Sequence, residues 1–322
     1  MAAACVVGVD LGGTKALAGA VDASLVVHHR ARREIWGLDQ RALLDAVVEV
    51  VDDVRAAVPA EVEAVGLGIP CTFDRRTGIA VQAVNLPLCD LPFRDVMAER
   101  LGVPVVVDND ANAAVLAEQR HGAAAGASEV ILLTVGTGIG GGIVMGGEVY
   151  RGSVGAAAEL GHTVIDVHGP PCQGTCPNRG CLEVMASGTA LSREAVRMAG
   201  EHPGSALGRA LAGGRGLSGQ FVVELAHDGD ADASAVVARI GRHLGVGIAN
   251  FVNVFNPEVV VVGGGVMAAG ELLLGPAREE VASRALPPAR DVVRIVPAGF
   301  GEEAGMVGAA VLVLEAAGVQ GA

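Results

Sequence analysis

The chain has 322 residues, of which 51% are hydrophobic and 18% charged, with a formal net charge of −13 at pH 7. This length predicts two domains, and the apolar content is ample for buried cores. The negative charge argues against nucleic acid as a partner, because phosphate backbones select basic surfaces.

Hydrophobic periodicity in the first 125 residues predicts one α/β domain. Short apolar segments read as strands, and longer segments carry apolar residues at helical spacing. The predicted order is three strands, a helix, a strand, a helix, a buried strand and a helix, at 5–10, 16–22, 25–35, 40–58, 62–70, 93–101, 103–107 and 111–121.

The pattern restarts near Gly126, with a hairpin turn expected at Gly146 and Gly147. The predicted strands and helices lie at 129–135, 142–145, from 148, 182–198, 234–253, 259–262, 271–284, 292–297 and from 303. Two halves of similar plan predict a duplicated α/β fold with approximate domains at 1–125 and 126–322. The terminal helix could pack back on the first domain, and a nucleotide would lie in the cleft between them.

The N-terminus gives no sign of a targeting segment or a membrane span. Met1 to Gly8 lacks a basic region and a cleavage site, and the longest uncharged stretch, 130–147, is interrupted by many glycines. We therefore expect a cytoplasmic protein without membrane partners.

A first candidate phosphate loop, D-L-G-G-T-K, follows the first predicted strand. Gly12 and Gly13 allow close backbone approach, so that amide groups can point at a phosphate, and Thr14 adds a hydroxyl. Lys15 is the only lysine in the chain, and Asp10 could hold Mg²⁺ directly or through water. An ordinary hairpin turn is the alternative interpretation of this segment.

Two further glycine-rich loops occur in the second half. T-V-G-T-G-I-G-G-G, which contains Thr137 and Gly138, is followed by a strand and not a helix, which argues against a dinucleotide-binding fingerprint and leaves a second phosphate loop. V-V-G-G-G-V, which contains Gly264 and Gly265, links a strand to a helix and would let adenosine pack against backbone.

Polar residues follow the buried strand at 103–107. Asp108, Asn109 and Asp110 stand directly before a predicted helix, where Asp110 is a candidate general base and Asn109 a hydroxyl ligand. Asp110 could instead simply cap the helix. Glu159 and His162, with Glu183 farther on, form a second polar group suited to hydroxyl ligands, because each carboxylate oxygen accepts two hydrogen bonds.

Three cysteines lie close together after His162. Cys172, Cys176 and Cys181 with His162 match a closed structural zinc site by ligand type and number. His168 as the fourth ligand, or thiols without a metal, are the alternatives.

Together these segments resemble the ROK family (repressors, uncharacterised reading frames and sugar kinases), and within it the bacterial glucokinases. The resemblance rests on six motifs in order: D-L-G-G-T-K, D-N-D-A-N-A-A, T-V-G-T-G-I-G-G-G, E-L-G-H, C-P-N-R-G-C-L-E and V-V-G-G-G. It departs from the family in the cysteine run, where two residues are inserted between the first two cysteines, and at Asp108, where the family usually has Glu.

The resemblance implies an actin/hexokinase-like fold of two RNase H-like domains with an interdomain cleft. It also implies an ATP-dependent hexose kinase with Mg²⁺ and structural Zn²⁺, most similar to glucokinase. The base would be Asp110, the hexose ligands Asn85, Asn109, Glu159, His162 and Glu183, and the zinc ligands His162, Cys172, Cys176 and Cys181. A homodimer or homotetramer is expected.

Two alternatives remain at the level of the sequence. The substrate could be another hexose: N-acetylglucosamine, N-acetylmannosamine, fructose, mannose or allose. Alternatively, the protein could be a non-catalytic sugar or nucleotide sensor.

Overall fold

The computed structural model describes residues 5–74, 76–83 and 85–318. The chain divides into two compact units, the first made of 1–126, 142–158 and 299–322 and the second of 127–141 and 159–298. Within the described residues, no helix is both long enough and apolar enough to cross a bilayer.

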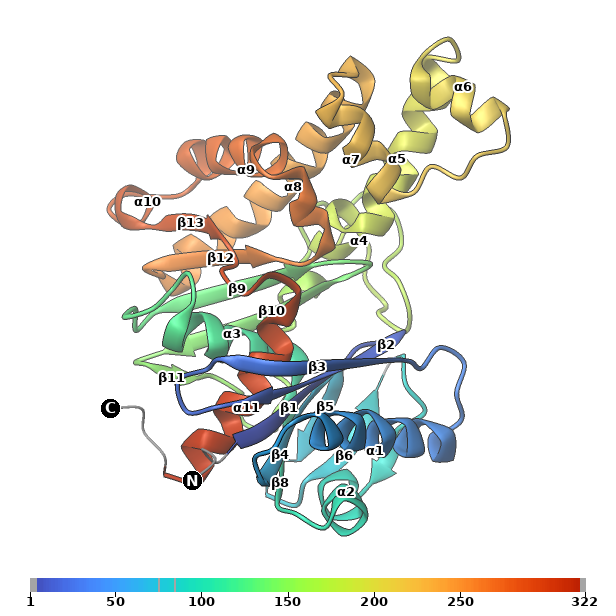
Figure 1. Ribbon diagram of the computed structural model, residues 1–322. Coiled ribbons are helices and arrows are strands. Elements are labelled where there is room, and N and C mark those ends of the chain that lie inside the picture. Colours follow the sequence, from blue (N-terminus) through green and yellow to red (C-terminus); the bar gives the residue numbers. More distant parts are fainter. Residues whose placement is uncertain (1–4, 75, 84, 319–322) are drawn as a thin grey trace. The chain divides into compact units, whose positions relative to one another are not determined.

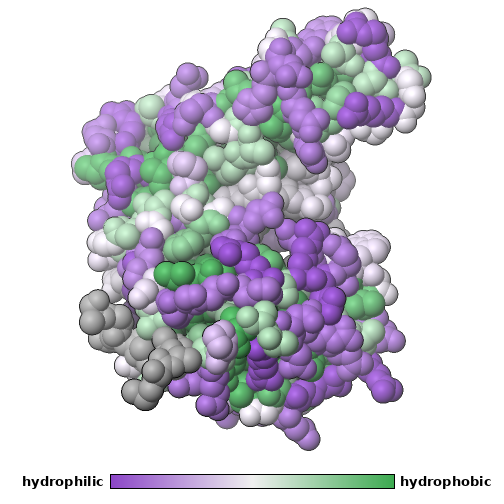
Figure 2. All heavy atoms as spheres, in the orientation of Figure 1, coloured by the Kyte–Doolittle hydropathy of each residue, from purple (hydrophilic) through white to green (hydrophobic). Residues whose placement is uncertain are grey.

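The first unit is built on a five-stranded sheet of order β3-β2-β1-β4-β8. Strand β1 pairs antiparallel with β2 and parallel with β4, and β8 is a parallel edge strand. Along β3 alternate side chains are exposed, and Figure 2 shows hydrophilic residues gathered over it. The bounds are β1 (Cys5–Leu11), β2 (Lys15–Val21), β3 (Val27–Glu34), β4 (Val62–Ile69) and β8 (Val105–Asn109).

Helices cover both faces of this sheet (Figure 1). Leu43 and Val47 of α1 share one buried core with Phe93 and Met97 of α2. The opposite face packs on α11, whose Ala310 belongs to a second core cluster, and α3 packs along α11. The bounds are α1 (Gln40–Ala57), α2 (Phe93–Leu101), α3 (Asp110–His121) and α11 (Ala304–Ala316), the last preceded by η3 (Gly301–Glu303).

Small residues bring α11 close to the sheet. A Cβ at Gly66 of β4 would lie 1.8 Å from the backbone oxygen of Ala309, and one at Gly8 of β1 would lie 2.0 Å from that of Met306. Any side chain at these two positions would push the helix away, so glycine is required for this approach.

The second sheet repeats the plan of the first, with the order β11-β10-β9-β12-β13. When the strands of each sheet are numbered by their order along the chain, both sheets have the spatial order 3-2-1-4-5. This shared topology confirms the predicted duplicated fold. The division between the units falls within β10, so β11 is grouped with the first unit. The bounds are β9 (Val130–Val135), β10 (Ile139–Met145), β11 (Glu148–Val149), β12 (Val259–Gly263) and β13 (Arg294–Pro297).

The helices of the second unit pack around α8, which contacts α4, α5, α7 and α9. The bounds are α4 (Leu182–Ala186), α5 (Gly188–Glu201), α6 (Ala206–Ala212), α7 (Gly219–His227), α8 (Ala231–Phe255), α9 (Glu271–Arg284) and α10 (Ala289–Val292). Two 3₁₀ turns are η1 (Leu160–His162) and η2 (Gly265–Ala269).

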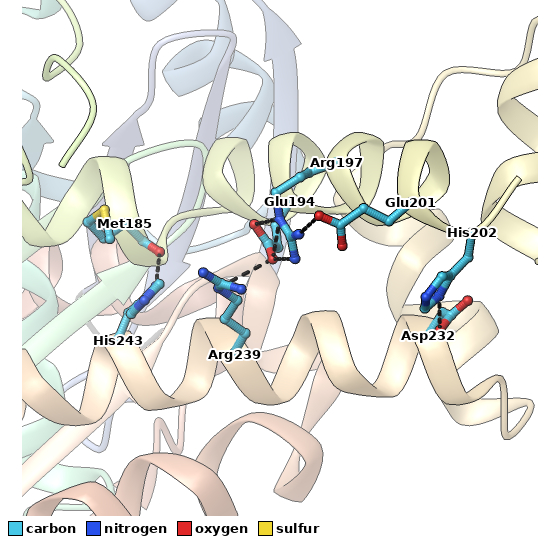
Figure 3. Close-up of polar contacts among 8 residues, drawn as sticks. All are labelled: Met185, Glu194, Arg197, Glu201, His202, Asp232, Arg239 and His243. Carbon is cyan, nitrogen blue, oxygen red and sulfur yellow. Dashed lines mark hydrogen bonds and ion pairs between the residues drawn. The ribbon is translucent and has the colours of Figure 1, made fainter.

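Polar contacts tie α5 and α4 to α8 (Figure 3). Burial opposes ionisation of Glu194, but its hydrogen bonds with Arg197 and the charge of Arg239 hold its pKa below the usual range. The ring of His243, whose pKa is lowered by burial, bonds through Nδ1 to the backbone oxygen of Met185, 3.0 Å away. The C-terminal end of α4 is thereby fixed to α8.

Several features differ from the sequence-based expectation. A three-stranded sheet of β5 (Cys71–Asp74), β6 (Ile79–Ala83) and β7 (Cys89–Leu91) was not predicted. The helix expected at 182–198 is two helices, because Ser187 ends α4 and its side chain caps α5 by accepting from Ala190. Helices α6, α7 and α10 were also missed, and the strand predicted from 292 begins at Arg294.

Candidate functional site

The first glycine loop is a tight turn between β1 and β2. Its closing hydrogen bond runs from the amide of Gly12 to the oxygen of Lys15, 2.9 Å away. Among the described residues, the amides of Gly13 and Thr14 have no backbone or side-chain acceptor, so both are available to a phosphate. The ammonium of Lys15 lies 3.0 Å from a carboxylate oxygen of Glu302.

Asn85 lies beside this loop. A Cβ at Gly13 would be 3.4 Å from the Cβ of Asn85, whose side chain is otherwise exposed. The structure therefore brings together, within the first unit, one predicted hexose ligand and the predicted phosphate loop.

Asp10 lies at the end of β1 in an unfavourable setting for a charge. Burial, followed by the nearby charge of Asp110, raises the pKa of Asp10 to about 7, against the opposing effect of Lys15. Two carboxylates that repel each other in this way are suited to a cation, which would favour the ionised form of both.

This setting predicts a pH-dependent effect of Asp10→Asn. A pKa raised from 3.8 in the unfolded chain to about 7 in the folded protein means that the folded state binds more protons between these values, so stability falls as pH rises through this window. The asparagine variant has no carboxyl group to ionise, so it does not lose this stability as pH rises. Without ligands it should be more stable than wild type above pH 7, by at most about 4 kcal/mol, and unchanged below pH 4.

Urea unfolding at several pH values measures this difference. A gain in stability that is the same at pH 4 and pH 8 would contradict the assignment of the shift to Asp10.

The junction of β8 and α3 carries the candidate base. Asn109 is the N-cap of α3, since its Oδ1 accepts from the amides of Ala111 and Asn112 at 2.9 and 3.2 Å. Asp110 is the first residue of the helix, so capping falls to its neighbour. The Oδ1 of Asp110 accepts from the amide of Ala111, 2.9 Å away. The amide nitrogen of the Asn109 side chain is not used by the cap and can donate to a ligand.

Hydrogen bonds connect the second glycine loop to the first turns of α4 and α5. The amide of Ile139 donates to Oε2 of Glu183 at 2.9 Å, and the hydroxyl of Thr189 donates to the oxygen of Thr137 at 2.8 Å. A Cβ at Gly138 would lie 2.3 Å from the Glu183 carboxylate, so only glycine permits this contact. Glu183 and the predicted phosphate loop thus lie together in the second unit.

The third glycine loop joins β12 to η2. Gly264 has a positive φ of 89°, and a Cβ there would meet the backbone of Val135 at 2.5 Å, so this glycine is needed for close packing of β12 on β9. At Gly265 nothing lies within 4 Å of the Cβ position, which leaves the backbone open to a ligand.

The three cysteines and His162 form one cluster. Their ligand atoms all lie within 4.8 Å of one another, with Cys172 Sγ 3.5 Å from Nδ1 of His162 and Cys176 Sγ 3.9 Å from Cys181 Sγ. Tetrahedral zinc–sulfur bonds would separate the ligands by about 3.8 Å. The donor set and its spacing therefore fit a structural zinc ion, and His168 is not a member of the cluster.

The backbone around the cluster connects it to Glu183. Cys181 is the N-cap residue of α4, and the amide of Leu182 donates to the oxygen of Thr163 at 2.8 Å. Glu159 is exposed and precedes η1, which ends at His162; its backbone oxygen accepts from the amide of His162 at 3.0 Å. A metal held here would therefore fix the backbone on both sides of the predicted hexose ligands of the second unit.

Two charged residues that help to position β8 and α3 of the first unit were not predicted. Arg151 forms an ion pair with the buried carboxylate of Asp108. Glu118 in α3 is fully buried and accepts hydrogen bonds of 2.8 to 3.0 Å from the amides of Ala123, Gly299 and Phe300. No sequence signal distinguishes Glu118, because the same helix also carries Asp110, Arg120 and His121.

Comparisons with known proteins agree with this geometry. The ROK family profile matches residues 6–316. The chain is 36% identical to the glucokinase of Thermotoga maritima, over 97% of this chain and 98% of that protein. It is 37% identical to the glucokinase of Halalkalibacterium halodurans, over 93% of this chain and 82% of that protein. The crystal structure of a ROK family glucokinase from Streptomyces griseus, in complex with glucose and AMPPNP, superposes with a TM-score of 0.86 at 36% identity, covering 96% of this chain and 98% of that chain. The protein described here belongs to the ROK family.

Proposed function

We propose that this protein is an ATP-dependent glucokinase that transfers the γ-phosphate of ATP to O6 of glucose. The observation that carries the proposal is the proximity of Asp110 to Asp10: Gly68 is the register partner of Asp10, and a Cβ at Gly68 would lie 3.5 Å from Cα of Asp110. Near-full-length similarity to glucokinases supports the choice of glucose.

The chemistry assigned to the first unit is proton acceptance and charge neutralisation. O6 attacks the γ-phosphorus, the bond to the β,γ-bridging oxygen breaks, and the O6 proton passes to the carboxylate of Asp110. Asp10 would hold Mg²⁺ directly or through water, and the loop of Gly12, Gly13, Thr14 and Lys15 would bind phosphate oxygens. The products are glucose 6-phosphate and ADP.

The groups assigned to the second unit bind the hexose and the nucleotide. Glu159, Glu183 and His162 would accept from or donate to sugar hydroxyls. The Nδ1 of His162 faces Cys172, so its Nε2 is the atom left for the sugar if zinc takes Nδ1. Thr137 and Gly138 would contact phosphates, and Gly264 and Gly265 the adenosine.

A coupled assay with glucose and ATP, extended to a panel of hexoses and phosphoryl donors, tests the proposal. We expect glucose to have the highest kcat/KM. A higher value for N-acetylglucosamine, N-acetylmannosamine, fructose, mannose or allose would keep the kinase and change its substrate, and sugar binding without turnover of any hexose would indicate a sensor. We further propose a cytoplasmic homodimer or homotetramer that binds no nucleic acid, which light scattering and a DNA-binding assay can check.

The double use of the Asn109 side chain gives a sharp prediction for Asn109→Asp. Aspartate caps helices as well as asparagine does, so the helix cap should be kept, and any loss of stability should come from the added charge between Asp108 and Asp110. The variant lacks the amide donor, however, and kcat/KM for the hexose should fall about 10- to 100-fold. Asn109→Ala is the matched control, because it should lose the cap as well, at a cost of about 1 kcal/mol.

Steady-state kinetics and thermal melts separate these effects. Unchanged kcat/KM in Asn109→Asp would show that the side chain serves the helix alone.

A further inference from the structure

The carboxylate of Asp108 is saturated with hydrogen bonds. Its Oδ1 accepts from the amide of Asn109 at 2.8 Å and from Nδ2 of Asn112 at 3.0 Å. Its Oδ2 accepts from Nε and Nη2 of Arg151 at 2.7 and 2.6 Å. Asp108 therefore fixes both the last residues of β8 and the first turn of α3, on either side of Asp110.

The ion pair with Arg151 is unusual in this protein. The two side chains are only 13% and 9% exposed, whereas every other ion pair between described residues has one partner that is at least 39% exposed. In surroundings shielded from water, a two-pronged guanidinium–carboxylate pair holds both partners in one geometry.

Arg151 is itself anchored in the segment after β11. Its Nη1 donates to the oxygen of Val149 at 3.1 Å, and its own backbone oxygen accepts from the amide of Ala157 at 3.2 Å. Gly155 in the same segment lies against β5, where a Cβ would meet the oxygen of Phe73 at 2.4 Å. The guanidinium therefore projects from a fixed segment.

We propose that Arg151 is a positioning residue for phosphoryl transfer: through Asp108 it sets the orientation of Asn109 and Asp110. This inference rests on the proposed function. A base displaced by even 1 Å loses much of its rate advantage, so the loss of this pair should lower kcat more than it raises KM for ATP.

A cavity beside the pair makes a chemical test possible. It has a volume of about 490 Å³, is partly open to solvent, and is lined by Asp108, Arg151, Arg94, Glu148 and Val149 among others. Arg151→Ala would enlarge this cavity by the space of a guanidinium group. A free guanidinium ion can therefore enter and pair with Asp108.

The experiment compares kcat and KM of wild type, Arg151→Ala and Arg151→Lys. We expect kcat to fall roughly 10- to 100-fold in Arg151→Ala, with KM for ATP little changed, and millimolar guanidinium to restore much of the loss. Arg94→Ala is the matched control. Its guanidinium lines the same cavity but pairs with Asp95, 2.9 Å away, so kcat should be unchanged with or without guanidinium.

Arg151→Lys keeps the positive charge and gives a second test if the alanine variant does not fold. Lysine cannot form the two-pronged pair, so kcat should fall about tenfold. An Arg151→Lys enzyme with wild-type kcat, or a folded Arg151→Ala enzyme that guanidinium does not rescue, would overturn the positioning role. A wild-type protein without hexose kinase activity would instead overturn the proposed function.

Discussion

Replacing Asp110 by asparagine is expected to lower kcat for glucose phosphorylation by roughly 10²- to 10⁴-fold, the range that general bases contribute. Asparagine has nearly the same shape and can still accept the hydrogen bond that Asp110 takes from the amide of Ala111. The start of α3 should therefore be preserved, and kcat should fall because the base that accepts the proton is missing. KM for ATP should change little.

The same variant should have a second, opposite effect. The charge of Asp110 raises the pKa of Asp10, so its removal should lower that pKa and stabilise the ligand-free protein near neutral pH. An Asp110→Asn protein that is at least as stable as wild type and yet nearly inactive would separate catalysis from folding. Asp45→Asn, on the exposed surface of α1, is the matched control. An Asp110→Asn protein that retains kcat within a small factor of wild type would exclude Asp110 as the base.

Removal of the zinc site is expected to have the second largest effect. The purified protein should contain one zinc ion per chain, which mass spectrometry of the metal can count. Cys181→Ser should lose the metal, lower the melting temperature and reduce kcat/KM for glucose roughly 10- to 100-fold. The reason is local, since Cys181 is the N-cap of α4 and lies two residues before Glu183.

Two histidine variants give the control for this prediction. His162→Ala should lose zinc and activity, whereas His168→Ala should keep both, because only His162 belongs to the cluster. The opposite result would make His168 the fourth ligand. A fully active protein that contains no zinc would show that the cysteines serve another purpose.

The features that could be predicted from the sequence are those that depend on neighbours along the chain. Helix α9 was predicted at its observed bounds, and the turn at Gly146 and Gly147 is confirmed by their positive φ angles. The zinc cluster was predicted from the type and number of its ligands, because these lie close together in the sequence and are of a rare chemical type.

What could not be predicted depends on distant partners. The ion pair of Arg151 spans 43 residues, and the hydrogen bond from Phe300 to Glu118 spans 182. In a single sequence neither residue differs from an ordinary surface charge. Strands β5 to β7 were missed because they are short: β5 alternates apolar with polar residues over only four positions, and β6 and β7 have neither a clear period of two nor a buried run.

The burial of α11 against β1 and β4 has a consequence for how the protein is made. The helix that completes the first unit is synthesised after the whole of the second unit, and Glu118 lacks its hydrogen bonds from the amides of Gly299 and Phe300 until that segment has been made. Domains of most proteins can fold in order during synthesis. Here the nascent first unit would keep an apolar sheet face uncovered until residues 304–316 have been made. The uncovered face is an aggregation risk while the second unit is being made, and slower translation would prolong that period.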